Sequence, residues 1–339
     1  MFFDLGLKSK LKNVTVLFGG RGIGKTYSAL YHEITEKSAD SKFIWLRDTE
    51  RVCEVIMSGE SLTAPIKKDH LDFPYVEILR DGKLNKFYAS DTADFEERKE
   101  IGYLMALSTF KNSRGVDFST TDIIYFDEFI PEVESVQKYD TGTLFLNAYE
   151  TVNRNRELFG QDPVKIVMMT NTNNIYSPVL KALGLSDIVE DMVEKGQKVF
   201  DSADVHIEFI ESKEFTEKKS KTLIYRLTED QTFKDSALNN QFTESRAMIK
   251  HYKLVGFTPV LQVNNQYVLL FRESDGIMYW KKGCYKNVQN YDMNNSQQAL
   301  YFRYAFADQL RKYYIANHMH FDSLYTQRDI LNFAKINGR

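Results

Sequence analysis

A glycine-rich segment near the amino end constrains the fold more than any other part of this 339-residue sequence. Residues Gly19–Thr26 have the sequence GGRGIGKT, which satisfies the pattern G-x-x-x-x-G-K-[ST] at every fixed position. The apolar run Val14–Phe18 before it predicts a buried strand, and Lys25–Glu36 after it predicts a helix. Four fixed positions match by chance in about one chain of this length in a hundred. A strand, this loop and a helix in that order predict a P-loop nucleotide-binding fold.

The residue types of the loop suit the binding of a polyphosphate. Its glycines let backbone N–H groups turn toward the phosphates, and the helix amino terminus adds positive potential. Lys25 is expected to reach the β- and γ-phosphates, and the Thr26 hydroxyl to bind Mg²⁺. Arg21 is a further catalytic candidate, acting within its own subunit. The predicted ligands are ATP and Mg²⁺, and the residues predicted to bind ATP are Gly19, Gly20, Arg21, Gly22, Ile23, Gly24, Lys25 and Thr26.

A second apolar run, Ile123–Phe126, ends in two acids, Asp127 and Glu128. In P-loop proteins, a strand that ends in an acid presents it beside the phosphate loop. Asp127 is predicted to bind the metal, and Glu128 to polarise the attacking water. A second adjacent acid is what a hydrolase needs, whereas a simple kinase or switch does not need it. The alternative interpretation is a strand end with two solvated acids.

Polar residues follow two other predicted strands. Asn171 comes after Lys165–Thr170 and is a candidate to contact the γ-phosphate or the water, with a turn cap as the alternative. Arg47 comes after Phe43–Leu46. If the sheet has the strand order of ATPases with the second acid, this strand neighbours the one that carries Glu128. Our hypothesis is that Arg47 then pairs with Glu128 and holds it away from water until DNA or a neighbour displaces it.

Arg154 and Arg156 close a helix predicted over Thr141–Glu157. Arginines are common near helix carboxyl ends because they complement the helix dipole. The functional alternative is an arginine finger that reaches the γ-phosphate of a neighbouring subunit. Lys111 and Arg114, in a polar loop before the strand that ends in the two acids, are further candidates to act on a neighbour.

Apolar strands that alternate with helices predict an α/β fold with a mostly parallel sheet for residues 1–190. Residues 191–231, which include the charged run Glu211–Lys221, are predicted to form a linker or lid. Residues 232–339 are predicted to form a small α+β domain. Its expected elements are strands over Thr258–Val263, Tyr267–Arg272 and Ile277–Lys281 and a helix over Ser296–Tyr314.

Composition narrows the class of protein. Apolar residues make up 43% and charged residues 27%, as in ordinary globular proteins. The longest apolar runs are far shorter than the ~20 residues of a membrane span, so no membrane partner is expected. Two cysteines give neither a disulfide framework nor zinc spacing, which predicts an intracellular protein. The net charge is −3, but residues 232–339 carry 14 basic and 8 acidic residues, a net of +6 that suits a polyanion or a solvated surface.

Four segments together resemble the DNA-packaging ATPase of small podoviruses of the phi29 kind. They are FGGRGIGKTYSAL, IIYFDEFIPE, YETVNRNRE and the strand end at Thr170-Asn171. LNNQF at Leu238–Phe242 and SDGIMY at Ser274–Tyr279 are also similar, so the resemblance runs over about residues 14–280. The phosphate loop alone indicates only a superfamily. The acidic element DEFI and the arginine-containing element NRNRE, in this order and at this spacing, are much more specific.

The resemblance implies an ATPase that works as a homomeric ring, usually of five subunits, and pumps double-stranded DNA into an empty capsid at its portal vertex. In the nearest relatives a packaging RNA joins ring and capsid. The expected location is the host cytoplasm, transiently the portal vertex of the procapsid, and not the mature virion. By position, Arg154 corresponds to the family's trans-acting arginine. Lys25, Asp127 and Glu128 correspond to its loop lysine, metal acid and catalytic acid.

The resemblance also implies a carboxy-terminal domain similar to a ribonuclease-H-like nuclease that has lost its acids. The strands predicted over Thr258–Val263 and Tyr267–Phe271 contain no acid, and a two-metal nuclease needs clustered carboxylates. Nuclease activity is therefore not expected. Five basic residues are candidates for contacts with DNA or RNA phosphates: Lys281, Lys282, Lys286, Arg311 and Lys312.

Two other functions remain open at this point. One is a different DNA-translocating ring ATPase, of the helicase or conjugation type. The other is a nucleotide-gated binding or assembly protein with slow turnover, against which Glu128 argues.

Overall fold

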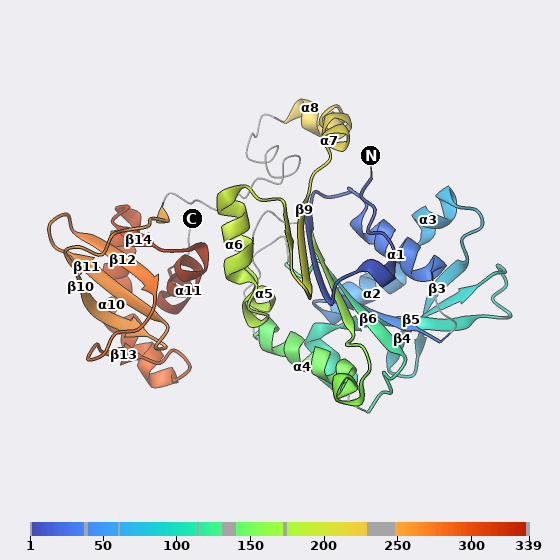
Figure 1. Cartoon of the computed structure of the whole chain (residues 1–339), viewed down its shortest axis with the longest axis horizontal. Helices are drawn as coiled ribbons and strands as arrows, with labels where there is room; N and C mark the ends of the chain where they lie inside the picture. The colour runs from blue at the N-terminus through green and yellow to red at the C-terminus, as the bar shows by residue number, and fades with distance from the viewer. Residues whose placement is uncertain are drawn as a thin grey trace. The chain divides into compact units, whose positions relative to one another are not determined.

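The computed structural model describes residues 2–36, 40–59, 62–113, 115–130, 140–171, 175–228 and 248–336. The chain divides into two compact units, Met1–Thr243 and Glu244–Arg339 (Figure 1). The domain boundary predicted at residue 232 lies outside the described residues, as do Arg114 and the LNNQF segment.

A nine-stranded sheet forms the centre of the first unit within the described residues, in the order β3-β4-β5-β2-β6-β7-β1-β9-β8. The six strands from β5 to β9 in this order run parallel, and both edges of the sheet are antiparallel. The strands are β1 Val14–Gly19, β2 Lys42–Arg47, β3 Tyr75–Asp81, β4 Leu84–Ser90, β5 Lys99–Ala106, β6 Thr121–Asp127, β7 Lys165–Thr170, β8 Val199–Asp201 and β9 Val205–Ile210.

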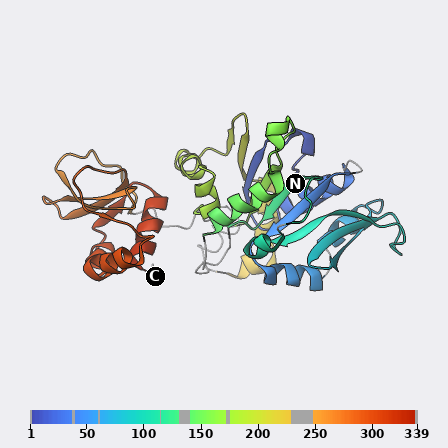
Figure 2. The ribbon, with the colours of Figure 1, turned by 90° about the horizontal axis from the view of Figure 1, so that it is seen from below.

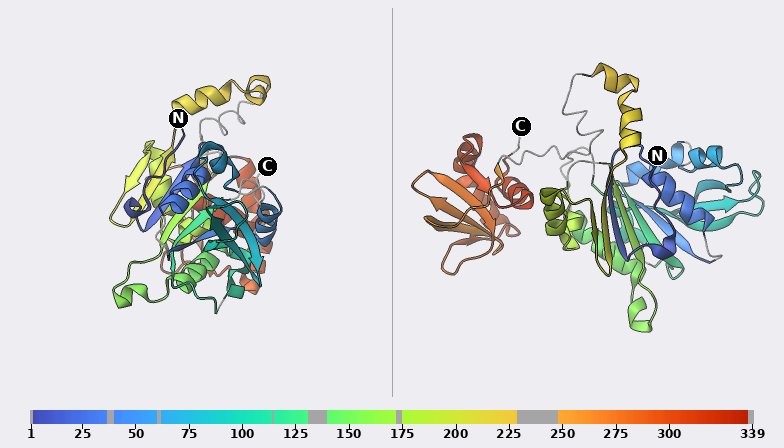
Figure 3. Two further views of the ribbon diagram at one scale, coloured as in Figure 1. Left: turned by 90° about the vertical axis from the view of Figure 1, so that its right-hand side faces the viewer. Right: turned by 45° about the horizontal axis from the view of Figure 1, so that its top comes forward.

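The central strands are continuous apolar runs because helices cover both of their faces. Figures 1 and 3 show α1 and α2 on one face of the sheet and α4, α5 and α6 on the other. The helices are α1 Lys25–Thr35, α2 Glu50–Ser58, α3 Ala64–Asp69, α4 Thr141–Asn153, α5 Pro178–Ala182, α6 Ser186–Lys195, α7 Lys213–Ser220 and α8 Leu223–Leu227. Short 3₁₀ turns are η1 Lys8–Lys10, η2 Leu107–Ser113 and η3 Arg156–Phe159. The α/β fold with a mostly parallel sheet is therefore confirmed.

Strand β7 lies between the phosphate-loop strand β1 and the acid-bearing strand β6, and β2 pairs with the other side of β6. This is the order expected of ATPases that carry a second acid, so the predicted adjacency of β2 and β6 is confirmed. All the polar residues that follow these strands meet at the carboxyl edge of the sheet.

The linker or lid predicted over residues 191–231 is wrong in its first part. Strands β8 and β9 belong to the sheet, and β9 pairs in parallel with β1 from Val14↔Val205 to Gly19↔Ile210. His206 and Glu208 interrupt the apolar run of β9, so its sequence does not have the continuous pattern of the central strands. The ATPase fold thus extends past residue 190 to Ile210, and among the described elements of this unit only α7 and α8 follow the sheet.

The second unit is an α+β fold, as predicted. Its described strands are β10 Phe257–Val263, β11 Tyr267–Arg272, β12 Ile277–Lys282, β13 Asn290–Tyr291 and β14 Met319–Phe321, in the order β13-β10-β11-β12-β14. The predicted turn at Asn264 and Asn265 joins β10 to β11, and both residues have a positive φ. Helices α10 Ser296–Ile315 and α11 Leu324–Ala334 cover one face (Figure 2). The ribonuclease-H-like character of this unit stays a prediction.

Helix α10 buries only some of its large apolar residues. Leu300 and Tyr304 are 67% and 90% exposed, whereas Ala299, Phe302 and Leu310 are the residues it buries.

In the part of the chain that the structure describes, no helix is long and apolar enough to span a membrane.

Candidate functional site

The phosphate loop has the conformation that its glycines predict. Strand β1 ends at Gly19, α1 begins at Lys25, and Gly22 and Gly24 have φ values of +83° and +106°. These left-handed values are accessible to glycine without strain. A Cβ at Gly19 would lie 3.4 Å from Lys25 Nζ and 3.3 Å from a β9 side chain. Glycine at these positions therefore keeps the backbone close to whatever the loop encloses.

Lys25 points into this loop and is 4% exposed. Its Nζ donates to the carbonyl oxygens of Gly19 at 2.8 Å and Gly20 at 3.3 Å, and to Asn171 Oδ1 at 2.8 Å. Asn171 follows β7, so the neighbouring strand brings its amide to the loop, as the sequence predicted. These oxygen partners stabilise a buried ammonium and can be replaced by phosphate oxygens.

Thr26 and Asp127 face each other across the carboxyl edge. The Thr26 hydroxyl lies 3.5 Å from Asp127 Oδ1 and 3.4 Å from Oδ2. Mg²⁺ binds oxygen ligands at about 2.0–2.1 Å in octahedral geometry, in which adjacent ligands lie roughly 3 Å apart. The two groups therefore fit a shared Mg²⁺. Burial raises the pKa of Asp127, and the Arg47 guanidinium opposes that rise.

Arg47 bridges the two acids. Its NH1 group donates to Asp127 Oδ2 at 2.7 Å, and its NH2 group donates to Glu128 Oε2. The contact predicted between Arg47 and Glu128 is therefore present, and its extension to Asp127 was not predicted. Glu128 has a φ of +54°, in the left-handed region that favours glycine. A non-glycine residue held there costs about 1–3 kcal/mol and is typical of functional sites.

Replacing Arg47 tests whether this pairing restrains Glu128. We expect Arg47→Ala to raise DNA-independent ATP hydrolysis about tenfold, because a hydrogen bond to a charged group is worth about 1.5–3 kcal/mol. Arg47→Lys keeps a cation near Asp127 without the two-pronged contact, and should give a smaller rise. Steady-state rates below each variant's melting temperature decide the result. If the basal rate and the DNA-stimulated rate were both unchanged, Arg47 would not restrain Glu128.

Arg154 and Arg156 lie at the opposite, amino edge of the sheet. Arg154 donates to the carbonyl of Val116 at 3.3 Å, and Arg156 donates to those of Phe118 at 3.1 Å and Ser119 at 2.9 Å. These carbonyls precede β6, which is seven residues or roughly 20 Å long. The fold therefore keeps both arginines away from the phosphate loop of their own chain.

The two arginines differ in their surroundings. Arg156 is half-buried, and this burial lowers its pKa. Arg154 is exposed and has φ 50° and ψ −131°, a backbone conformation that residues other than glycine rarely adopt. Lys111 is exposed in η2, which follows β5. Arg154 is therefore the more available of the two arginines for a contact outside its own chain.

Helix α7 packs on the tip of the phosphate loop. The Phe215 ring would lie 3.6 Å from a Cβ at Gly22, and Lys219 Nζ donates to the Arg21 carbonyl at 2.8 Å. Burial and the nearby Arg21 charge lower the pKa of Lys219. The charged run predicted as part of a lid thus contacts the loop, and it brings Arg21 next to α7.

An aromatic-lined cavity of about 710 Å³ opens beside the loop. Tyr27 donates to Asp69 Oδ2 at 3.1 Å, and the rings of Tyr31 and His70 lie 4.6 Å apart. Flat, mostly apolar walls with a few polar groups suit a nucleoside base. No sequence motif links α1 to α3, so these residues were not predicted. The lining includes Phe2, Phe3, Tyr27, Tyr31, Leu62, Pro65, Asp69, His70 and Asn171.

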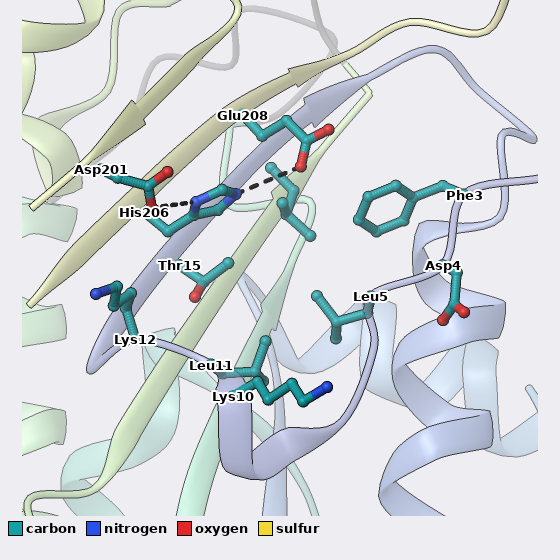
Figure 4. Close-up of a pocket in the computed structure, with 11 residues that line it drawn as sticks. Phe3, Asp4, Leu5, Lys10, Leu11, Lys12, Thr15, Asp201, His206 and Glu208 are labelled. Atoms are coloured by element: carbon teal, nitrogen blue, oxygen red, sulfur yellow. Dashed lines mark hydrogen bonds and ion pairs between the residues drawn. The ribbon is translucent and has the colours of Figure 1, made fainter.

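A smaller cavity, of about 180 Å³, is lined by part of the amino-terminal segment and by residues of β1, β8 and β9 (Figure 4). His206 Nδ1 is 2.7 Å from Asp201 Oδ1, and its Nε2 is 3.4 Å from Glu208 Oε2. The Thr15 hydroxyl is buried there without a hydrogen-bond partner among the described residues. Within the described ranges, no three His, Cys, Asp or Glu side chains are placed to hold a metal ion. None of the predicted site residues lines this cavity.

Comparison with known proteins identifies relatives of the whole arrangement. The model of the Podovirus DNA encapsidation protein (Gp16) family matches residues 3–298. The DNA packaging proteins of Bacillus phages phi29 and PZA are each 26% identical over 228 residues, which is 67% of this chain. The match spans 61% of the length of each of these relatives.

Two solved structures share the fold. The bacteriophage Phi-29 viral genome packaging motor assembly has a TM-score of 0.65 at 18% identity, and covers 98% of this chain and 97% of its own. The Phi-28 gp11 DNA packaging motor has a TM-score of 0.62 at 17% identity, and covers 98% of this chain and 96% of its own. At these identities the likeness confirms the fold.

Proposed function

Because this chain belongs to the Podovirus DNA encapsidation protein (Gp16) family, we propose that it is the ATPase that drives double-stranded viral DNA into a preformed capsid. Its subunits form a homomeric ring, of five copies, at the portal vertex. One observation carries the proposal. Lys25, Thr26, Asp127, Glu128 and Asn171 converge at one edge of the sheet around a phosphate loop.

Hydrolysis proceeds by attack of water on the γ-phosphorus of ATP. Glu128 accepts the proton of the water as the new P–O bond forms, and the bond to the β,γ-bridging oxygen breaks to release ADP. Lys25 leaves its carbonyl partners and binds the β- and γ-phosphate oxygens. The Thr26 hydroxyl and the Asp127 carboxylate would hold Mg²⁺. When bound, this ion would supply positive charge that offsets the charge on the phosphate oxygens.

The cavity beside the loop supports ATP as the substrate. A base seated between the amino-terminal segment, α1 and α3 would place its triphosphate toward Lys25 and Thr26. The aromatic rings of Tyr31 and His70 offer stacking surfaces.

Arg154 supplies a positive charge to the phosphate site of the neighbouring subunit. Its exposure, its strained backbone and its distance from its own loop support this role. Arg156 instead anchors its turn through two backbone carbonyls. Arg21 acts in its own subunit, at the tip of the loop that α7 contacts.

The second unit contacts nucleic acid through phosphates, because a pump must accept any sequence. Lys281 and Lys282 close β12, Lys286 follows in an exposed turn, and Arg311 and Lys312 are exposed on α10. Binding through these residues would weaken steeply with salt as counterions compete. The portal, and a packaging RNA that joins ring and capsid, are the further partners we propose. The ring acts in the host cytoplasm, at the procapsid, and leaves before the virion matures.

Steady-state ATP hydrolysis with and without long double-stranded DNA tests the proposal, in the presence and absence of procapsids. We expect DNA to stimulate the wild-type rate, and Lys25→Ala to lose both basal and stimulated hydrolysis because the loop cation is gone. A wild-type rate that is indifferent to DNA even with procapsids would favour a nucleotide-gated assembly protein. Unwinding of a forked substrate would instead favour a helicase.

A further inference from the structure

Two large apolar side chains project from the turn η3. Leu158 is 81% exposed and Phe159 is 79% exposed. The base of this turn is held firmly, since Arg156 bonds to the carbonyls that precede β6 and its own carbonyl accepts from the Gln161 N–H at 3.0 Å. Figures 1 and 3 show this green turn, after α4, at the end of the first unit opposite α7. An anchored turn therefore presents two adjacent apolar residues to solvent.

Arg154 lies just before this turn, as the C-cap of α4, in its strained conformation. Arg154 and Leu158 are four residues apart, so at most about 14 Å separates their backbones. Both lie at the amino edge of the sheet, whereas the phosphate loop lies at the carboxyl edge. Any partner that covers Leu158 and Phe159 therefore also lies close to Arg154.

A second exposed apolar patch lies beside the phosphate loop. Leu223, Ile224 and Leu227 of α8 are 63%, 57% and 68% exposed. Helix α8 is tied to the loop through α7, because Lys219 bonds to the Arg21 carbonyl and lies 5.6 Å from the Tyr225 ring. Leu223 follows Lys219 by four residues, so at most about 14 Å separates their backbones, the same bound as between Arg154 and Leu158.

We propose that Leu158 and Phe159 of one copy dock on α8 of the next copy, and that this contact delivers Arg154 to the phosphate loop of that neighbour. The patches lie at opposite edges of one fold, so their pairing is heterologous and closes into a ring if the rotation permits. A second copy is the occupant, because the apolar counterpart of each patch is on this same chain. The α8 patch also lies beside the phosphate loop, which Arg154 of its own chain does not reach. The delivery of Arg154 rests on the proposed function, whereas the docking contact stands independently of it.

Cysteine cross-linking tests the contact itself. The exposed Cys284 is first replaced by serine, and the buried Cys53 is retained. Phe159→Cys combined with Ile224→Cys should then give a ladder of covalent oligomers with a short bis-maleimide. Each single variant should give no ladder. Leu146→Cys, on the exposed face of α4, combined with Ile224→Cys is the matched control pair. No ladder beyond this control, with and without procapsids, overturns the proposal.

Loss of the apolar anchor tests its consequence. We expect the double variant Leu158→Ser/Phe159→Ser to fold normally, bind ATP normally, and need about 30-fold more protein for half-maximal hydrolysis, as for loss of an interface hot spot. Val55→Ser, at a 64% exposed position on α2, removes a comparable apolar side chain and should change nothing. A double variant with the wild-type concentration dependence overturns the anchor. Wild-type protein that hydrolyses no ATP would refute the proposed function, while cross-linking would still report on the docking.

Discussion

Glu128→Gln is expected to lower ATP hydrolysis by about 10²–10⁴-fold, the contribution typical of a positioned general base. The amide has nearly the shape of the carboxylate but cannot accept the proton of the attacking water. ATP affinity should remain close to wild type, because Lys25 and Thr26 are unchanged. Single-turnover hydrolysis and equilibrium binding of a fluorescent ATP analogue measure the two effects separately.

Asp122→Asn is the matched control for this substitution. Asp122 lies on the same strand, β6, but at its amino end, where it pairs with Lys8 at 2.6 Å. Loss of this ion pair should lower stability only, so hydrolysis per folded molecule should be unchanged. If Glu128→Gln retained the wild-type rate while Asp122→Asn behaved as expected, Glu128 would not be the base.

Arg154→Ala is expected to lower hydrolysis by about 10³–10⁵-fold, the range reported for arginine fingers. The loss should appear only in assembled protein, since Arg154 and the phosphate loop of one chain lie at opposite edges of the sheet. Arg156→Ala should instead lower the melting temperature, because it removes the anchor to Phe118 and Ser119.

Mixing two inactive variants distinguishes action on a neighbour from action within one chain. Arg154→Ala retains an intact phosphate loop, and Lys25→Ala retains Arg154. In a mixed ring some intact loops face an intact arginine, so part of the activity should return. A mixture as inactive as its components, in protein that still assembles, would show that Arg154 acts otherwise or not at all.

Local pattern was sufficient for the central strands and the phosphate loop. Strands β1, β2, β6 and β7 are buried on both faces and so appear as continuous apolar runs. The loop requires glycine at positions with positive φ, which leaves a distinct local signature. The polar residues at the strand ends could be placed together because parallel strands deliver their carboxyl ends to one edge.

Local pattern failed where burial is uneven or where partners are distant in sequence. Strand β9 contains His206 and Glu208 and so lacks a continuous apolar run, although it extends the sheet beside β1. The aromatic cavity joins Tyr27 and Tyr31 to His70 through packing of α1 against α3. No periodicity in one segment records such a contact.

The sequence by itself determined the chemistry available at the site, because a phosphate loop, a metal acid and a second acid each need particular residue types at short spacing. Only the tertiary structure decided which other side chains and helices these groups contact. Arg47 bridges both Asp127 and Glu128, and α7 contacts the loop, because strand order and packing bring together residues up to 198 positions apart. It also decided that Arg154 faces away from its own loop, because α4 runs back along the sheet and ends at the opposite edge.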